Sequence, residues 1–149
     1  MKIDTQGVET LLAKLAVRSG MSLAGLASGR QQAYRLLLAC AARAFATDRD
    51  YSEAQVNAAL RTWLGGTGAM LATDHVELRR LLVDARLLER DGFGRRYRRT
   101  QPPPRAFTAL LAALAGVDAD HLAREARDRD RAQREARREA FAKDRATPP

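Results

Sequence analysis

The sequence predicts a mainly α fold: a winged helix-turn-helix core with a small β-hairpin wing, and further helices on either side. Apolar residues recur at helical spacing in several separate segments. Two of these segments begin with a capping-box pattern, and the hairpin dipeptide Asp91-Gly92 separates two short extended segments. Helices followed by a hairpin are the order of a winged helix, an elaboration of the helix-turn-helix unit.

The first part of the chain predicts two helices joined by a loop. Residues 5–18 carry apolar residues at helical spacing and end at Ser19-Gly20. The stretch 19–30 holds three glycines and three serines, so we expect a loop with at most one turn around residues 23–26. A second helix is expected over residues 31–46, with the apolar stripe Tyr34, Leu37, Leu38, Ala41 and Phe45.

The central part predicts two capped helices and the hairpin. Ser52 and Gln55 form one capping-box pattern, and the helix that follows ends in the glycine-rich residues 65–68. Asp74 and Glu77 form a second, which opens a helix up to about Ala85. Residues 87–90 and 95–98 are then expected to be strands joined by a turn at residues 91–94.

Three consecutive prolines, residues 102–104, form a stiff spacer that predicts the edge of a domain. Beyond it we expect a short amphipathic helix at residues 107–114 and, after a cap at Asp118, a frayable helix from Ala119 to about Lys143. The predicted division is therefore an N-terminal helix and loop (1–29), a winged-helix domain (30–101) and a C-terminal extension (102–149). We expect the core to survive removal of the residues after Pro104.

Composition indicates a partner class and argues against catalysis. The net charge is +8, and 23 of the 26 basic residues are arginine, which favours a polyanion as partner, although a GC-rich genome would give the same bias. With two histidines, and one cysteine (Cys40) inside an apolar run, no catalytic set, cofactor or metal site is expected. No apolar run is long enough to cross a bilayer and no signal peptide is evident, which predicts a cytoplasmic protein.

Arginines are concentrated on the predicted wing. Residues 86–99 hold six arginines against Glu89 and Asp91. Because side chains alternate along a strand, Arg96 and Arg98 should project on one side, opposite Tyr97; if Tyr97 packs on the core, they are the freer pair. The expected nucleic-acid contacts, on the wing and on the third helix, are Arg79, Arg80, Arg90, Arg95, Arg96, Arg98 and Arg99.

Residues 30–100 resemble DUF2087, a bacterial domain of unknown function found alone or attached to helix-turn-helix regulators. The resemblance lies in the segment from Asp48 to Asn57, the helix from Asp74 to Asp84, and the Leu-Leu-Glu-Arg and Gly-Arg-Arg-Tyr strands. It implies a winged-helix-like fold and a link to transcriptional regulation, and supplies no catalytic residues. Two departures are a longer glycine-rich connection (65–73) and Arg98, where many members carry tryptophan.

The interpretation that combines these observations is a DNA-binding, arginine-rich bacterial transcriptional regulator, with the third helix in the major groove and the wing on the backbone. The acids Glu77 and Asp84 on that helix keep an alternative open, a non-catalytic protein-interaction module on a winged-helix scaffold. RNA or ribosome binding is a third alternative. A homodimer formed through the terminal helices is also compatible with the sequence, and no membrane partner is expected.

Overall fold

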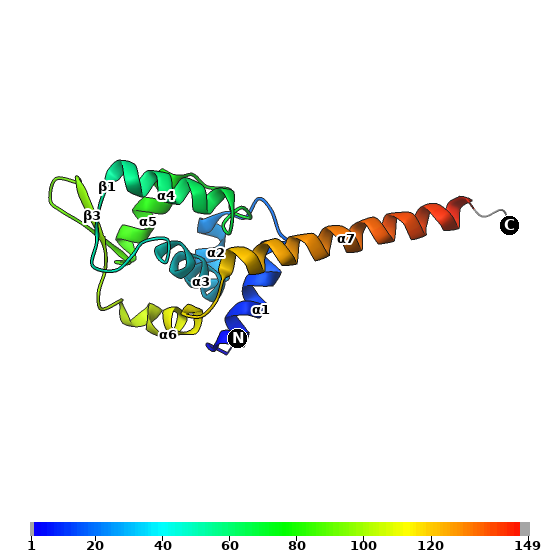
Figure 1. The fold of residues 1–149 in the computed structure, drawn as a ribbon, viewed down its shortest axis with the longest axis horizontal. Helices are drawn as coiled ribbons and strands as arrows, with labels where there is room; N and C mark the ends of the chain where they lie inside the picture. Colours follow the sequence, from blue (N-terminus) through cyan, green and yellow to red (C-terminus); the bar gives the residue numbers. More distant parts are fainter. Residues whose placement is uncertain (1, 147–149) are drawn as a thin grey trace.

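A computed structural model describes residues 2–146 as seven α-helices and one three-stranded antiparallel sheet (Figure 1). The mainly helical fold predicted from the sequence is confirmed. The elements in chain order are α1 (Thr5–Ala16), α2 (Leu23–Gly29), α3 (Gln31–Ala42), β1 (Asp50–Ser52), α4 (Glu53–Gly65), α5 (His75–Asp84), β2 (Leu88–Arg90), β3 (Arg96–Arg99), α6 (Arg105–Leu114) and α7 (Ala119–Ala146).

Helix α3 lies at the centre of the molecule. Eight of its twelve residues are buried, and it packs against α1, α2, α5 and α6. It ends at Ala42, four residues earlier than predicted, because the chain leaves the helix in a turn and then reverses at Asp48, whose φ is +58°. Phe45 still reaches the core from that turn and is 1% exposed.

The segment expected to be a loop contains α2, so that prediction was wrong. The Ser22 hydroxyl caps the helix by accepting a hydrogen bond of 2.9 Å from the Gly25 amide. Leu23 and Leu26 are buried against the core. Glycine and serine lower the intrinsic helix propensity of this stretch, but burial of two leucines outweighs that cost.

The capped starts of α4 and α5 were predicted correctly, with one difference. Ser52 and Gln55 exchange both capping-box hydrogen bonds, at 2.8 and 3.1 Å. At α5, Asp74 accepts from the Glu77 amide at 2.8 Å, but the Glu77 carboxylate binds the Thr73 hydroxyl instead of returning the bond. Between the two helices the chain must turn tightly at Gly68, where any Cβ would overlap the ring of Trp63.

The hairpin turns at residues 91–94 as predicted, and a third strand that the sequence did not predict completes the sheet. Strand β3, which starts one residue later than expected, lies between β1 and β2 in the order β1-β3-β2. Tyr51 of β1 is paired with Tyr97 of β3. A strand between the first two helices of the core, paired with the last strand of the hairpin, gives the chain a winged-helix-like arrangement.

The flanking helices share the core of the winged helix. Helix α6 buries Phe107, Leu110 and Leu114 against α3 and α1. Helix α7 starts after Asp118, which accepts a hydrogen bond of 3.1 Å from the His121 amide, and buries Ala123 and Ala126. One continuous apolar cluster therefore includes residues from all three predicted ranges, 1–29, 30–101 and 102–149. The division of the chain into these ranges stays a prediction.

Residues 2–146 include no single membrane-spanning helix and no metal-binding cluster. No single helix there is long and apolar enough to cross a membrane, and α6 and α7 meet both requirements only as a pair bent by 69°. The same part of the chain holds no group of three or more histidine, cysteine, aspartate or glutamate side chains placed to hold a metal ion.

Truncation tests whether the C-terminal helices belong to the core. Each buried leucine or phenylalanine of α6 contributes about 1.5–3 kcal/mol by leaving water, against a total stability of about 5–15 kcal/mol for a domain. Contrary to the expectation from the prolines, we expect a chain ending at Gln101 to lose its cooperative thermal transition in circular dichroism. A chain ending at Asp130, which removes only exposed residues from the described part of the chain, should keep its Tm; equal behaviour of the two chains would contradict this prediction.

Candidate nucleic-acid interface

The seven arginines predicted to contact nucleic acid lie on two elements and differ in exposure. Two belong to α5 and five belong to the sheet and its turn, at the far end of the molecule from the C-terminus (Figure 1). Five are exposed, namely Arg80, Arg90, Arg95, Arg96 and Arg98. Arg79 and Arg99 are partly buried, and each forms a contact inside the fold.

Arg79 joins α5 to α4. Its Nη1 donates a hydrogen bond of 2.6 Å to Oδ1 of Asn57 and lies 3.0 Å from Oε1 of Glu53. The side chain is only 19% exposed. The guanidinium thus holds the two helices together, which makes Arg79 a poor choice for a base contact.

Arg99 lies on the inner side of the sheet. Its Nη1 donates a hydrogen bond of 3.1 Å to the Phe45 carbonyl, which lies just past the end of α3. Burial lowers the pKa of Arg99, and the nearby charge of Arg43 lowers it further. Tyr97 is 2% exposed on the same side, so the predicted alternation of faces along β3 is confirmed.

The outer face of the wing is balanced in charge, because β1 supplies an acid that the sequence did not place there. Nε of Arg98 lies 2.9 Å from Oδ1 of Asp50, and Nη1 of Arg96 lies 3.9 Å from its Oδ2. Arg98 is also paired in register with Glu89 on β2. Arg96 and Arg98 therefore project outward opposite the buried Tyr97, as expected, but the two arginines face two acids.

The tip of the wing is basic and aromatic. Phe93 is 86% exposed, and the guanidinium carbon of Arg95 lies 5.9 Å from the centre of its ring. The side chain of Arg90 is exposed and forms no hydrogen bond or ion pair with any other part of residues 2–146. The tip thus presents an exposed ring beside Arg95, with Arg90 at the end of β2, and neither arginine forms an ion pair with an acid among residues 2–146.

Asp91 is the one acid of the turn, and its carboxylate binds backbone amides of the hairpin. Its Oδ1 accepts hydrogen bonds from the backbone amides of Arg95, at 2.8 Å, and Arg96, at 3.4 Å. These bonds, the Arg95 amide first, lower the pKa of Asp91. The carboxylate therefore shapes the turn and does not pair with the arginine side chains around it.

Helix α5, which occupies the place of the third helix of the core, is not basic on its exposed side. It presents Arg80 between the acids Glu77 and Asp84, and Val76 is 50% exposed beside them. The pKa of Tyr34 on α3 is raised by burial and then by the charges of these two acids. Arg80 is accordingly the only arginine of α5 with a side chain available to a ligand.

Two further residues shape the charged surface and were missed from the sequence. Asp50 falls in a short strand that carries no clear period-two pattern. Arg127 of α7 donates to the carbonyls of Ala16, Gly66 and Thr67 at 2.9, 2.8 and 3.1 Å. No local sequence signal identifies Arg127, because its acceptors lie 60 to 111 residues away.

A family model described as an uncharacterized protein conserved in bacteria (DUF2087) matches residues 23–99. This is just over half of the chain. The chain belongs to the DUF2087 family. The match begins at the first residue of α2 and ends at the last residue of β3, so the DUF2087 region contains the sheet and leaves α1, α6 and α7 outside. No curated protein and no solved structure matches the chain.

The two neighbouring arginines of α5 should differ sharply when replaced by alanine. Arg79→Ala removes a hydrogen bond and an ion pair between helices and should lower the free energy of unfolding by about 1–2 kcal/mol. Arg80→Ala changes an exposed side chain and should stay within about 0.5 kcal/mol of the parent. Urea unfolding followed by circular dichroism measures both, and equal losses would contradict the structural role of Arg79.

Proposed function

We propose that this DUF2087 protein binds duplex DNA through its wing, without a catalytic step, as a cytoplasmic bacterial transcriptional regulator. The observation that carries the proposal is the tip of the wing, where the exposed ring of Phe93 lies beside Arg95 and the exposed Arg90 ends the strand that leads into the turn. Arginine side chains enter the minor groove, and apolar side chains such as phenylalanine insert between base steps there. A tip with both kinds of side chain suits that groove.

Helix α5 takes the major groove in this proposal, with a limited role in reading bases. Arg80 is its one available arginine, and a bidentate contact from arginine to guanine is the commonest specific contact. Glu77 and Asp84 lie beside it and repel phosphates. We therefore expect affinity to come mainly from the wing and the backbone, with modest sequence preference.

The same acids favour a second function, in which α5 contacts a protein. Val76 is half exposed next to Glu77 and Asp84, so the helix offers an apolar side chain inside an acidic surface. This surface suits a basic protein partner better than it suits a phosphate backbone. Binding to DNA that weakens as salt is added is expected for the DNA function and is not expected for the protein-contact function.

Replacement of the two tip arginines tests the DNA proposal. The double variant Arg90→Ala/Arg95→Ala should weaken binding equally on unrelated duplexes and reduce the slope of log K against log salt by about 0.9 for each lost phosphate contact. Phe93→Ala should weaken binding with an unchanged slope, because it removes no charge. Fluorescence anisotropy of a labelled duplex at graded salt measures both effects.

The matched control is Arg96→Ala/Arg98→Ala, which removes the same charge from arginines already paired with Asp50. It should change the slope less than the tip variant does. If the control changes the slope more than the tip variant does, the phosphate contact lies on the outer face of the wing and not at the tip. If the parent protein shows no salt-dependent binding to any duplex, the DNA proposal fails and the protein-contact function takes its place.

A further inference from the structure

The second half of α7 leaves the body of the molecule. Every residue from Arg131 to Ala146 is exposed, whereas Ala123 and Ala126 near the start of the helix are buried. In Figure 1 this half extends away from the fold at the end opposite the wing. It carries six basic residues and three acids, so its surface is positive.

Arginines of α7 fall on one face of the helix. Arg127, Arg131, Arg134, Arg138, Phe141 and Arg145 follow one another at alternating steps of four and three residues. At about 100° per residue these six positions lie within an arc of about 80°. We call the four that extend past the anchor Arg127 the arginine stripe: Arg131, Arg134, Arg138 and Arg145.

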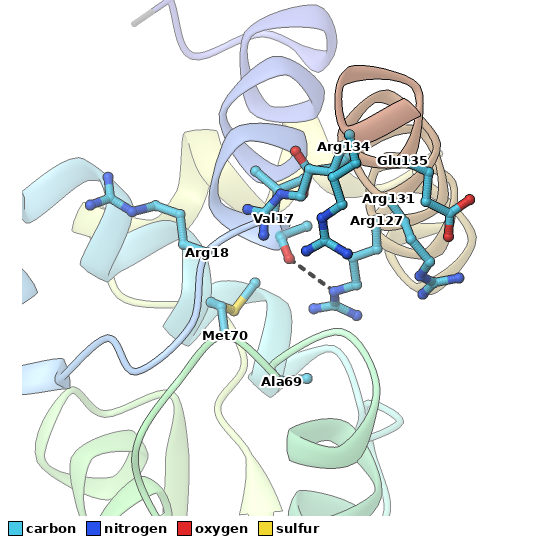
Figure 2. Close-up of a pocket in the computed structure, with 11 residues that line it drawn as sticks. Val17, Arg18, Ala69, Met70, Arg127, Arg131, Arg134 and Glu135 are labelled. Atoms are coloured by element: carbon cyan, nitrogen blue, oxygen red, sulfur yellow. Dashed lines mark hydrogen bonds and ion pairs between the residues drawn. The ribbon is translucent and has the colours of Figure 1, made fainter. Parts of the chain in front are cut away.

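The part of the arginine stripe nearest the body of the protein lines a groove of about 370 Å³ between α7 and the end of α1 (Figure 2). It consists of Arg131, Arg134 and Arg138. Arg127 anchors the helix there through the Ala16 carbonyl, drawn as a dashed line in Figure 2. Arg18 belongs to the opposite wall, and its side chain forms no hydrogen bond or ion pair with the rest of residues 2–146. The five arginines that line the groove outnumber its two acids, Asp130 and Glu135.

The acids near the stripe form pairs with it in which the arginine side chain is exposed. Arg134 lies 3.0 Å from Asp130, and Arg131 lies 3.3 Å from Asp128. Arg138 has no such pair among the described residues. Exposed ion pairs contribute little to stability and are screened by salt, so an arginine exchanges its carboxylate for a phosphate at small cost.

We propose that the arginine stripe is a second surface of this protein that binds the phosphate backbone of duplex DNA. From Arg131 to Arg145 the stripe extends about 21 Å at 1.5 Å per residue. One strand of duplex carries about six phosphates over that length, at one per 3.4 Å, so each arginine has a phosphate within its reach. The stripe shares its ligand with the proposed function but lies on a different surface.

A protein is a poorer occupant of the stripe than DNA. Helices that dock on proteins carry apolar anchors at these spacings. Here the face holds arginine at every such position beyond Arg127 except Phe141, a single exposed ring whose centre lies 5.3 Å from the guanidinium carbon of Arg145. Guanidinium groups in a row match phosphates, because each binds one through two parallel hydrogen bonds.

The test compares two double variants of the full chain that remove the same charge from the same helix. Arg134→Ala/Arg138→Ala changes the stripe, and Arg129→Ala/Arg137→Ala changes exposed arginines on other faces. In anisotropy titrations with a labelled 24-base-pair duplex, the stripe variant should reduce the salt slope by about two units and weaken binding at least about tenfold at 0.1 M salt. The control variant should reduce the slope by less than about half of that.

The outcomes separate this inference from the proposed function. If the stripe variant and its control lose affinity equally, binding follows net charge alone and the inference is overturned. If only Arg90→Ala/Arg95→Ala weakens binding, the proposed wing contact is supported and the stripe inference is overturned. If only the stripe variant weakens binding, the wing contact is overturned and the stripe inference is supported. A stripe effect confined to an RNA duplex of the same sequence, with DNA binding unchanged, also overturns it, and a parent protein that binds no DNA overturns both.

Discussion

Burial of α3 on nearly all sides is the constraint on which the rest of the structure depends. A helix with eight of twelve residues buried needs neighbours around its whole circumference, and the winged-helix elements cover only part of it. Helices α1 and α6, which lie outside the DUF2087 region, cover the remainder. The flanking helices are thus needed to keep apolar residues of α3, such as Leu36 and Leu37, out of water.

The attachment of the wing to this core determines which of its charges face a ligand. Tyr97 packs inward and Arg99 binds the Phe45 carbonyl, so the sheet lies against the turn that follows α3. Strand β1 then brings Asp50 beside β3, where its carboxylate pairs with Arg96 and Arg98. Arg90 and Arg95 form no ion pair with an acid among the described residues. The number of arginines in a strand is therefore a poor guide to the charge that the strand presents.

The features predictable from the sequence were those encoded by neighbouring residues. The caps at Ser52, Asp74 and Asp118 and the turn at Asp91-Gly92 involve partners within a few positions, and all were located correctly. Features that depend on distant partners were missed. Helix α2 forms because its leucines find a core made by other helices, and β1 is a strand only because β3 lies beside it.

In the candidate site, too, features that depend on neighbouring residues were predictable and features that depend on distant partners were not. Exposure of the tip arginines could be inferred from the hairpin pattern. The ion pairs of Asp50, the bond from Arg79 to Asn57 and the three bonds of Arg127 join segments far apart in the chain, so no local pattern reveals them. Arg79 and Arg99 are poor candidates for nucleic-acid contacts because their side chains bind other parts of the fold, and these partners could not be identified from the sequence.

The projection of α7 gives this protein two layers of stability. Up to Asp130 the helix is held by the core and unfolds only with it. Beyond that point every described residue is exposed and none belongs to the apolar core, so the order of the helix rests largely on pairs four residues apart, which contribute about 0.2–0.5 kcal/mol each. Such a segment melts from its free end gradually, below the temperature at which the core unfolds. A ligand along it would have to stop this fraying, so binding there would include an ordering cost that grows with temperature.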